Sequence, residues 1–261
     1  MNYRTILLAS AAVMFAGSAM AADLTNPFYL PGQGEVTSDT AVAYNRAKMK
    51  HDIPTSKQTV VGEQVMYGVT DNFAVQGTIA NSFDTDKEYN NDHNFSYDVG
   101  ALYNMRSGDV LGQVSASYMT WNPKDFYGKR NAKAAMGDKS DRWQKILNGE
   151  VKIGYDMGDG LVPYASYSLT GNIDSANRYL DQSVKAGVHK YANAWAVDAG
   201  IRYDFNTDGK NTNQWYAEAE ADYYLKNNIA LGVFGDYFLA GSGSDDIDYD
   251  YTAGAHVKVL F

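Results

Sequence analysis

Residues 94–105 read NFSYDVGALYNM, and this short stretch decides how the chain folds. Apolar side chains occupy the odd positions from Phe95 to Met105, whereas most even positions from Asn94 to Asn104 are polar or small. A repeat of two is that of a β-strand, because successive side chains of a strand point to opposite faces of the sheet. The stretch therefore predicts a strand with one apolar and one polar face.

Two later stretches repeat the alternation and add acids to the polar face. Residues 195–205 read WAVDAGIRYDF, and residues 215–225 read WYAEAEADYYL. In the second stretch, Glu218, Glu220 and Asp222 share one face. Each unpaired carboxylate in a dry core would cost several kcal/mol, so this face of the sheet is expected to be wet.

The N-terminus, residues 1–22, has the features of a cleaved export signal. Arg4 precedes an apolar run from Ile6 to Phe15, and small residues around Ala21 fit the pattern that signal peptidase cleaves. The mature chain is predicted to form one domain, residues 23–261. It has no further apolar run of eighteen residues, so any crossing of a membrane would have to use strands.

The composition narrows the classes of function. The chain has 31 Asp+Glu against 22 Lys+Arg, a net charge of −9, and we expect no nucleic-acid partner because phosphates need a basic face. It has no cysteine, which excludes disulfide scaffolds and thiolate metal sites. No phosphate-binding loop or dinucleotide fingerprint occurs, and we predict no cofactor and no metal. The negative mean hydropathy by itself would indicate a water-soluble protein.

Turn signals divide the chain into strands of similar length. Eleven strands are predicted, at residues 35–46, 58–69, 73–82, 94–105, 110–121, 144–156, 161–170, 194–205, 214–225, 229–240 and 248–261. Tight turns alternate with long polar stretches, as in a transmembrane barrel, and bacterial single-chain barrels have an even number of strands. A twelfth strand at 182–191 restores the even number and puts the five tight connections on one side. Ten strands is the alternative.

The C-terminal strand gives the most specific signal. Apolar side chains alternate from Tyr251 through Val257 and Val259 to the terminal Phe261. This pattern resembles the last strand of bacterial outer-membrane β-barrel proteins. The resemblance implies an all-β, antiparallel up-and-down barrel in the outer membrane, in contact with its lipid and lipopolysaccharide. It also implies that the barrel-assembly machinery reads Tyr251, Val257, Val259 and Phe261 as its signal.

Aromatic residues gather near the predicted strand ends. The amphipathic rings of Tyr and Trp favour the level of the lipid headgroups. The residues assigned to this belt are Trp121, Trp143, Trp195, Trp215, Tyr223, Tyr237, Tyr249 and Tyr251.

If the apolar faces meet lipid, the polar faces line the lumen. The predicted lining residues are Asp98, Glu150, Lys152, Asp156, Asp198, Arg202, Asp204, Glu218, Glu220, Asp222, Asp236, Asp250, His256 and Lys258. Acids outnumber bases in this set, so the lumen would attract cations and repel anions. The leading hypothesis is a narrow, cation-preferring passive diffusion pore for small solutes. The alternative is a lumen filled by a hydrogen-bonded network around the three bases.

Four other features carry weaker hypotheses. The basic stretch 122–142 could adhere to lipopolysaccharide or a glycan, which would make the barrel a surface structure. Asp92 and His93 loosely fit a surface hydrolase, but no catalytic spacing is present and an enzyme is not predicted. The acidic run 245–250 is interpreted as a solvated loop. Residues 26–32, with two prolines, cannot supply a full set of ladder donors and are assigned either to the periplasm or to the lumen.

Overall fold

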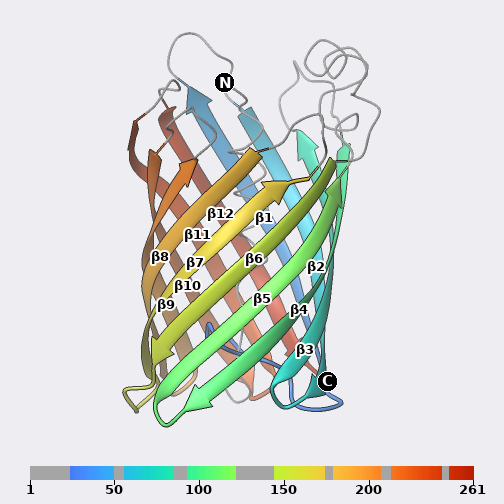
Figure 1. Ribbon diagram of the computed structural model, residues 1–261, viewed down its shortest axis with the longest axis vertical. Helices are drawn as coiled ribbons and strands as arrows, with labels where there is room; N and C mark the ends of the chain where they lie inside the picture. The colour runs from blue at the N-terminus through green and yellow to red at the C-terminus, as the bar shows by residue number, and fades with distance from the viewer. Residues whose placement is uncertain are drawn as a thin grey trace.

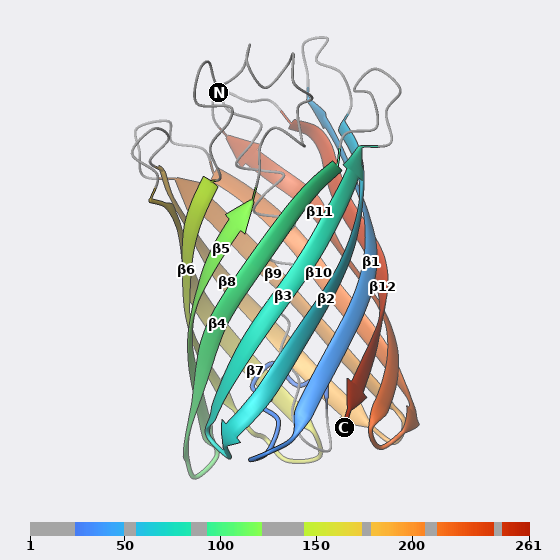
Figure 2. The ribbon, with the colours of Figure 1, turned by 90° about the vertical axis from the view of Figure 1, so that its right-hand side faces the viewer.

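The computed structural model describes residues 24–49, 56–84, 93–121, 144–173, 179–206, 213–242 and 247–261. Within these ranges one antiparallel sheet of twelve strands closes into a barrel (Figures 1 and 2). The strands are β1 (Val36–Met49), β2 (Ser56–Thr70), β3 (Phe73–Asp84), β4 (His93–Ser107), β5 (Val110–Trp121), β6 (Gln144–Tyr155), β7 (Leu161–Asn172), β8 (Tyr179–Ala192), β9 (Trp195–Asn206), β10 (Asn213–Lys226), β11 (Ile229–Ser242) and β12 (Ile247–Leu260). The described residues contain no helix that is long and apolar enough to span a membrane.

The barrel closes between the first and the last strand. β1 pairs with β12 from Thr37 opposite Leu260 to Met49 opposite Ile247. Beyond the strand end, the backbone N–H of Phe261 donates to the carbonyl of Val36 at 2.9 Å. Every strand thus has two neighbours, and no row of unpaired backbone groups is left at a sheet edge.

The predicted strands are confirmed, including the twelfth. The strand predicted at 182–191 is β8, and the alternative with ten strands is wrong. Every predicted end lies within three residues of the observed end. Short connections join β2 to β3, β4 to β5, β6 to β7, β8 to β9 and β10 to β11, as the count of twelve requires.

The backbone of these short connections explains their sequence signals. Gly108, Gly158 and Gly160 have φ angles of 61°, 80° and 73°, and Asn193 has a φ of 58°. Glycine and asparagine tolerate this left-handed region better than most residues, which is why turn signals in the sequence marked these sites.

The alternation places the apolar side chains on the outside of the barrel. Val99, Val151 and Ile153 are 61%, 54% and 59% exposed, and they belong to a continuous apolar outer wall. A water-soluble protein does not expose an apolar surface of this extent. The outer wall is that of a transmembrane barrel, so the naive reading of the mean hydropathy is wrong.

Six of the eight aromatic residues assigned to the belt face outward from the barrel. Trp195, Trp215, Tyr223 and Tyr237 are exposed on the outer wall, and Tyr249 and Tyr251 are partly exposed. Trp121, in contrast, is buried in the interior against Met119 and Ile146. It shares the odd parity of the inward residues of β5, so the alternation itself excludes it from the belt. Trp143 lies outside the described residues.

The outward orientation of these residues predicts how a charge on the outer wall changes the stability of the barrel. Val151→Arg places a charge in the middle of the outward face of β6 and should lower the free energy of unfolding in lipid vesicles by about 2–4 kcal/mol. Val110→Arg is the control, because Val110 faces outward opposite Tyr155 at a strand end, where the cost falls to about 0–1 kcal/mol. Equal costs at both positions, measured by urea titration, would contradict the assigned orientation.

Candidate functional site: the interior of the barrel

The N-terminal segment, residues 24–34, lies inside the barrel at the end where the short turns and the C-terminus are found (Figures 1 and 2). Leu24, Phe28, Tyr29 and Leu30 are at most 6% exposed. Of the two sequence-based assignments for this stretch, the lumen is therefore correct. Its two prolines cost no backbone hydrogen bond of a sheet, because the segment forms no strand.

A ring of apolar side chains on the inner wall receives this segment. Ten of the twelve strands, all except β1 and β6, contribute one residue each, and we call this set the apolar ring. Its members are Met66, Ala74, Leu102, Leu111, Val162, Tyr191, Ala196, Tyr224, Ala230 and Leu260. Leu102 and Ala196 occupy the otherwise polar face of their strands, so the sequence switches from polar to apolar at the level of the segment. The ring and the segment bury each other's apolar surface.

Polar contacts fix the segment within the apolar ring. The ammonium of Lys152 donates to the carbonyl of Pro27 at 2.8 Å, and the Asn104 amide donates to the carbonyl of Phe28. The Phe28 ring packs edge-on against Tyr164 with centroids 6.3 Å apart. A Cβ on Gly154 would lie 2.5 Å from the Phe28 ring, so only glycine leaves room for it there.

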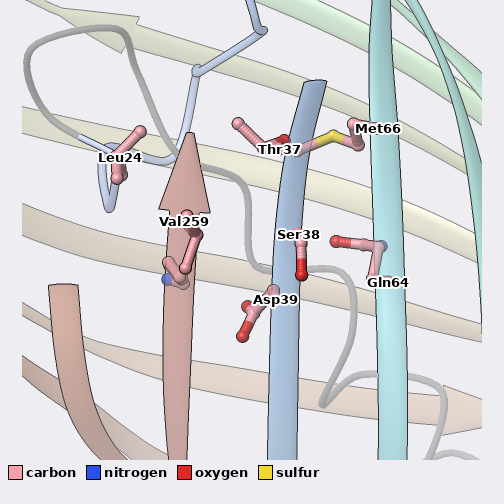
Figure 3. A pocket seen from close by; sticks show the side chains of 8 residues that line it. Leu24, Thr37, Ser38, Asp39, Gln64, Met66 and Val259 are labelled. Atoms are coloured by element: carbon pink, nitrogen blue, oxygen red, sulfur yellow. The ribbon is translucent and has the colours of Figure 1, made fainter. Parts of the chain in front are cut away.

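A small recess remains beside the segment. It lies between Leu24 of the segment and the side chains of Thr37, Gln64 and Met66 on β1 and β2 (Figure 3). Asp39 lines the same recess. The recess therefore joins the apolar level of the lumen to the charged level above it.

The first charged cluster joins β1, β10 and β12. His256 lies between two acids, with Nε2 2.9 Å from Asp222 Oδ1 and Nδ1 3.4 Å from Asp39 Oδ1. The ammonium of Lys258 lies 2.7 Å from Glu220 Oε1. All five side chains are at most partly exposed, so they form a compact network of ion pairs in the lumen.

Three members of this cluster also have the spacing of metal ligands. One ligand atom each from Glu220, Asp222 and His256 lie within 4.8 Å of one another. The Lys258 ammonium, however, is already paired with Glu220 and supplies a cation to the group. A positive neighbour of this kind opposes the binding of a metal cation, so we interpret the group as an ion-pair network.

A second charged cluster joins β8, β9 and β10. Arg202 donates from Nε to both carboxylate oxygens of Asp204 at 2.9 and 3.0 Å, and it also pairs with Glu218. Lys185 lies 2.9 Å from Glu218 and 3.5 Å from Asp198. Each base therefore faces two acids, and the cluster keeps excess negative charge.

Asp236 and Asp250 extend the acidic surface across β11 and β12. Asp236 is opposite Glu218 in the β10–β11 register. Asp250 is buried and accepts hydrogen bonds from the Asn45 amide at 3.1 Å and the Tyr216 hydroxyl at 3.3 Å. Together with the two clusters, these acids make one side of the lumen, β8 to β12 with β1, strongly charged. We call it the charged wall.

The opposite side of the lumen, on β2 to β5, carries mainly uncharged polar side chains. Gln64 donates to Gln76 at 3.5 Å, and Gln113 donates to Asn104 at 2.9 Å. Asp98 is an acid on this side and hydrogen-bonds to its polar neighbours. Charge is thus distributed unevenly around the lumen, and most of its acids lie on the charged wall.

The remaining predicted residues fall into three places. Glu150 and Lys152 face the lumen from β6, with Nζ and Oε2 3.6 Å apart. Asp156 follows the end of β6 and pairs with Arg106 at 2.9 Å, where both side chains are substantially exposed. It lies at the rim and not with the other predicted lining residues, because the inward alternation stops at Tyr155. The outer face of β12 carries Tyr251, Val257 and Val259, and Phe261 comes directly after the end of the strand.

Among the lumen residues outside the predicted set are two charged ones that take part in the clusters. Asp39 on β1 pairs with His256, and Lys185 on β8 pairs with Glu218. Both have the parity of the inward residues of their strands, and that parity was the signal that could have found them.

Several weaker hypotheses concern residues that the structure does not describe. The predicted export signal at 1–22, the basic stretch 122–142, Asp92 and the acids 245–246 all lie outside the described residues. The hypotheses of adhesion and of surface hydrolysis therefore stay predictions. The prediction of a solvated loop over 245–250 is wrong for residues 247–250, which belong to β12 and include the buried Asp250.

The sequence matches no known protein family. It also matches no curated protein. Its fold is similar to that of an outer-membrane channel from Pseudomonas putida F1, with 9% identity over 90% of this chain and 98% of that chain and a TM-score of 0.63.

Two further solved structures share the fold. The translocator domain of the autotransporter NalP from Neisseria meningitidis has 11% identity over 98% of this chain and 97% of its own, with a TM-score of 0.59. The NanC porin has 11% identity over 84% of this chain and 98% of its own, with a TM-score of 0.54. At these identities the similarity shows the fold alone, a closed antiparallel β-barrel.

The seating of the N-terminal segment is open to a direct test. Phe28→Ala removes the ring that packs on Tyr164 and Gly154 and should weaken docking by about 3 kcal/mol. Hydrogen exchange at the backbone amides of residues 28 and 29 should then accelerate about 100-fold. The control Phe95→Ala removes a ring from the outer wall and should leave these rates unchanged. Unchanged exchange in Phe28→Ala would show that the segment is not held by this contact.

Proposed function

We propose that the protein is a passive diffusion pore of the bacterial outer membrane, narrow and preferring small cationic solutes. The proposal is supported most by the charged wall, where Arg202 and Lys185 each face two acids and Asp236 and Asp250 add further negative charge. A column of excess carboxylates attracts cations and repels anions. The fold shared with an outer-membrane channel and a porin is consistent with this role.

The N-terminal segment decides the resting state of such a pore. Since the segment fills the apolar ring at the turn side of the barrel, and the recess beside it has room for about one water molecule, solutes pass only when the segment is displaced. The recess carries Asp39 and Lys258. We therefore propose a pore of low basal conductance whose periplasmic mouth is closed by its own N-terminal segment.

The partners of this pore follow from its outer surface. Near the loop side of β1, Arg46 lies over the Tyr249 ring at 5.2 Å, and Lys48 pairs with Asp248 at 2.9 Å. Basic side chains beside aromatic rings at this level fit the anionic headgroups of lipopolysaccharide. We also propose that the barrel-assembly machinery reads the end of β12, including Val257 and Phe261.

Removing the segment should open the pore. A mature chain that lacks residues 24–34 should show a mean conductance in planar bilayers at least about tenfold higher than the full chain, because even about 1.4 kcal/mol of docking energy would suffice to keep about nine segments in ten seated. Equal conductance in the full chain and the deletion would contradict closure by the segment. Absence of conductance in both would contradict the pore itself.

The charge of the lumen should set ion selectivity. In the deletion chain, a KCl gradient should give a reversal potential of the sign for cation preference. Asp236→Asn combined with Asp250→Asn should move that potential towards zero. Asp109→Asn is the control, because Asp109 lies in the exposed turn before β5. A potential that indicates anion preference, or that the lumen substitutions do not move, would contradict the proposed selectivity.

A further inference from the structure

One carboxylate faces the wrong way for a barrel in a membrane. Glu63 has odd parity on β2, the parity of the exposed Val61, Val65 and Tyr67, whereas the buried Gln64 and Met66 point inward. Glu63 therefore lies on the outer wall. Among the outward-facing strand residues that the structure describes, no other acid lies away from the strand ends.

The depth of Glu63 is close to the middle of the outer wall. Tyr67 lies four residues away towards the turn side, and Lys57 lies six residues away towards the loop side. With about 3.3 Å per residue and a tilt near 40°, these steps amount to roughly 10 and 15 Å along the barrel axis. Glu63 thus lies within the hydrocarbon layer, beyond the reach of headgroups and water.

Other polar side chains accompany Glu63. The Ser38 hydroxyl donates to Glu63 Oε1 at 2.5 Å, and the Thr40 hydroxyl donates to Oε2. On the next strand, Asn81 also has outward parity and adds a polar side chain to this part of the wall, although its Oδ1 is covered by the chain's own atoms. We call Ser38, Thr40, Glu63 and Asn81 the polar patch.

Hydrocarbon chains offer this patch neither a hydrogen-bond partner nor an opposite charge. A lipid-facing carboxylate is unfavourable at this depth even when two hydroxyls satisfy its oxygens. The cost is offset when a second protein wall with polar groups at the same depth covers the patch. In an outer membrane such a wall belongs to another β-barrel.

We propose that the polar patch is the contact between two copies of this chain. The patch is self-complementary, because it holds hydroxyl donors and a carboxylate acceptor, so that a hydroxyl of one copy can face the carboxylate of the other. A two-fold axis along the membrane normal, passing between β1 and β2, sets Thr40 of each copy against Glu63 of the other. The flanking side chains Val42 and Val61, opposite each other in the register, are compact and let the two walls approach closely. The contact is independent of whether the lumen conducts.

The absence of native cysteine allows a sharp test in native outer membranes. Val42→Cys puts one thiol beside the proposed axis, on a side chain that is 48% exposed. Val184→Cys on β8 is the matched control, a valine 42% exposed on the opposite wall. After oxidation with a membrane-permeant catalyst, Val42→Cys should give a species of twice the protomer mass, and Val184→Cys should not.

A second substitution shows whether the patch carries the contact. Glu63→Leu in the Val42→Cys background removes a charge from the lipid face, so this variant is expected to fold. Its yield of cross-linked dimer should fall about tenfold, the change that 1.4 kcal/mol produces. The proposal is overturned by any of three results: Val42→Cys stays monomeric, both cysteine variants cross-link equally, or Glu63→Leu leaves the yield unchanged. A cross-linked species of another mass would assign the patch to a different protein and equally overturn a second copy.

Discussion

The whole structure depends on one constraint: inside a membrane, every backbone N–H and C=O must find its partner within the protein. A sheet satisfies this only when its two edges meet, and here β1 and β12 meet over nearly their full length. Closure in turn forces each strand to present one face outward and one inward. The period-two pattern of the sequence is the consequence, and it separates an apolar outer wall from an acidic interior within a chain whose mean hydropathy indicates neither.

Closure also creates an interior that must be filled or wetted. Eight strands leave room for side chains only, and sixteen leave a water channel, so twelve lie between these cases. This protein divides its interior by depth. At the turn side, the apolar ring holds the N-terminal segment through Phe28 and Leu24, whereas further up the charged wall keeps its carboxylates close to bases such as Arg202 and Lys258. The net charge of −9 thus becomes, in large part, a property of one side of the lumen.

The alternation of side chains made the fold predictable from the sequence, down to the weak strand β8. It also placed most lumen residues, because inward parity is local information. What escaped prediction depends on depth or on distant contacts. The ring that Leu102 and Ala196 help to build looks like scattered exceptions on polar faces until the strands are aligned. Likewise, nothing local in residues 26–32 reveals that Lys152, more than 120 residues away, binds the carbonyl of Pro27. Trp121 shows that residue type alone misleads when parity is ignored.

The central claim is that successive residues of each strand face lipid and lumen in turn. The most direct measurement places a spin label at each position from 95 to 104 in lipid vesicles and compares collisions with oxygen and with a water-soluble nickel complex. We expect oxygen accessibility to peak at the odd positions, Phe95 to Tyr103, and to fall at every even position. Accessibility without a period of two, or nickel collisions dominating at the odd positions, would contradict the transmembrane barrel.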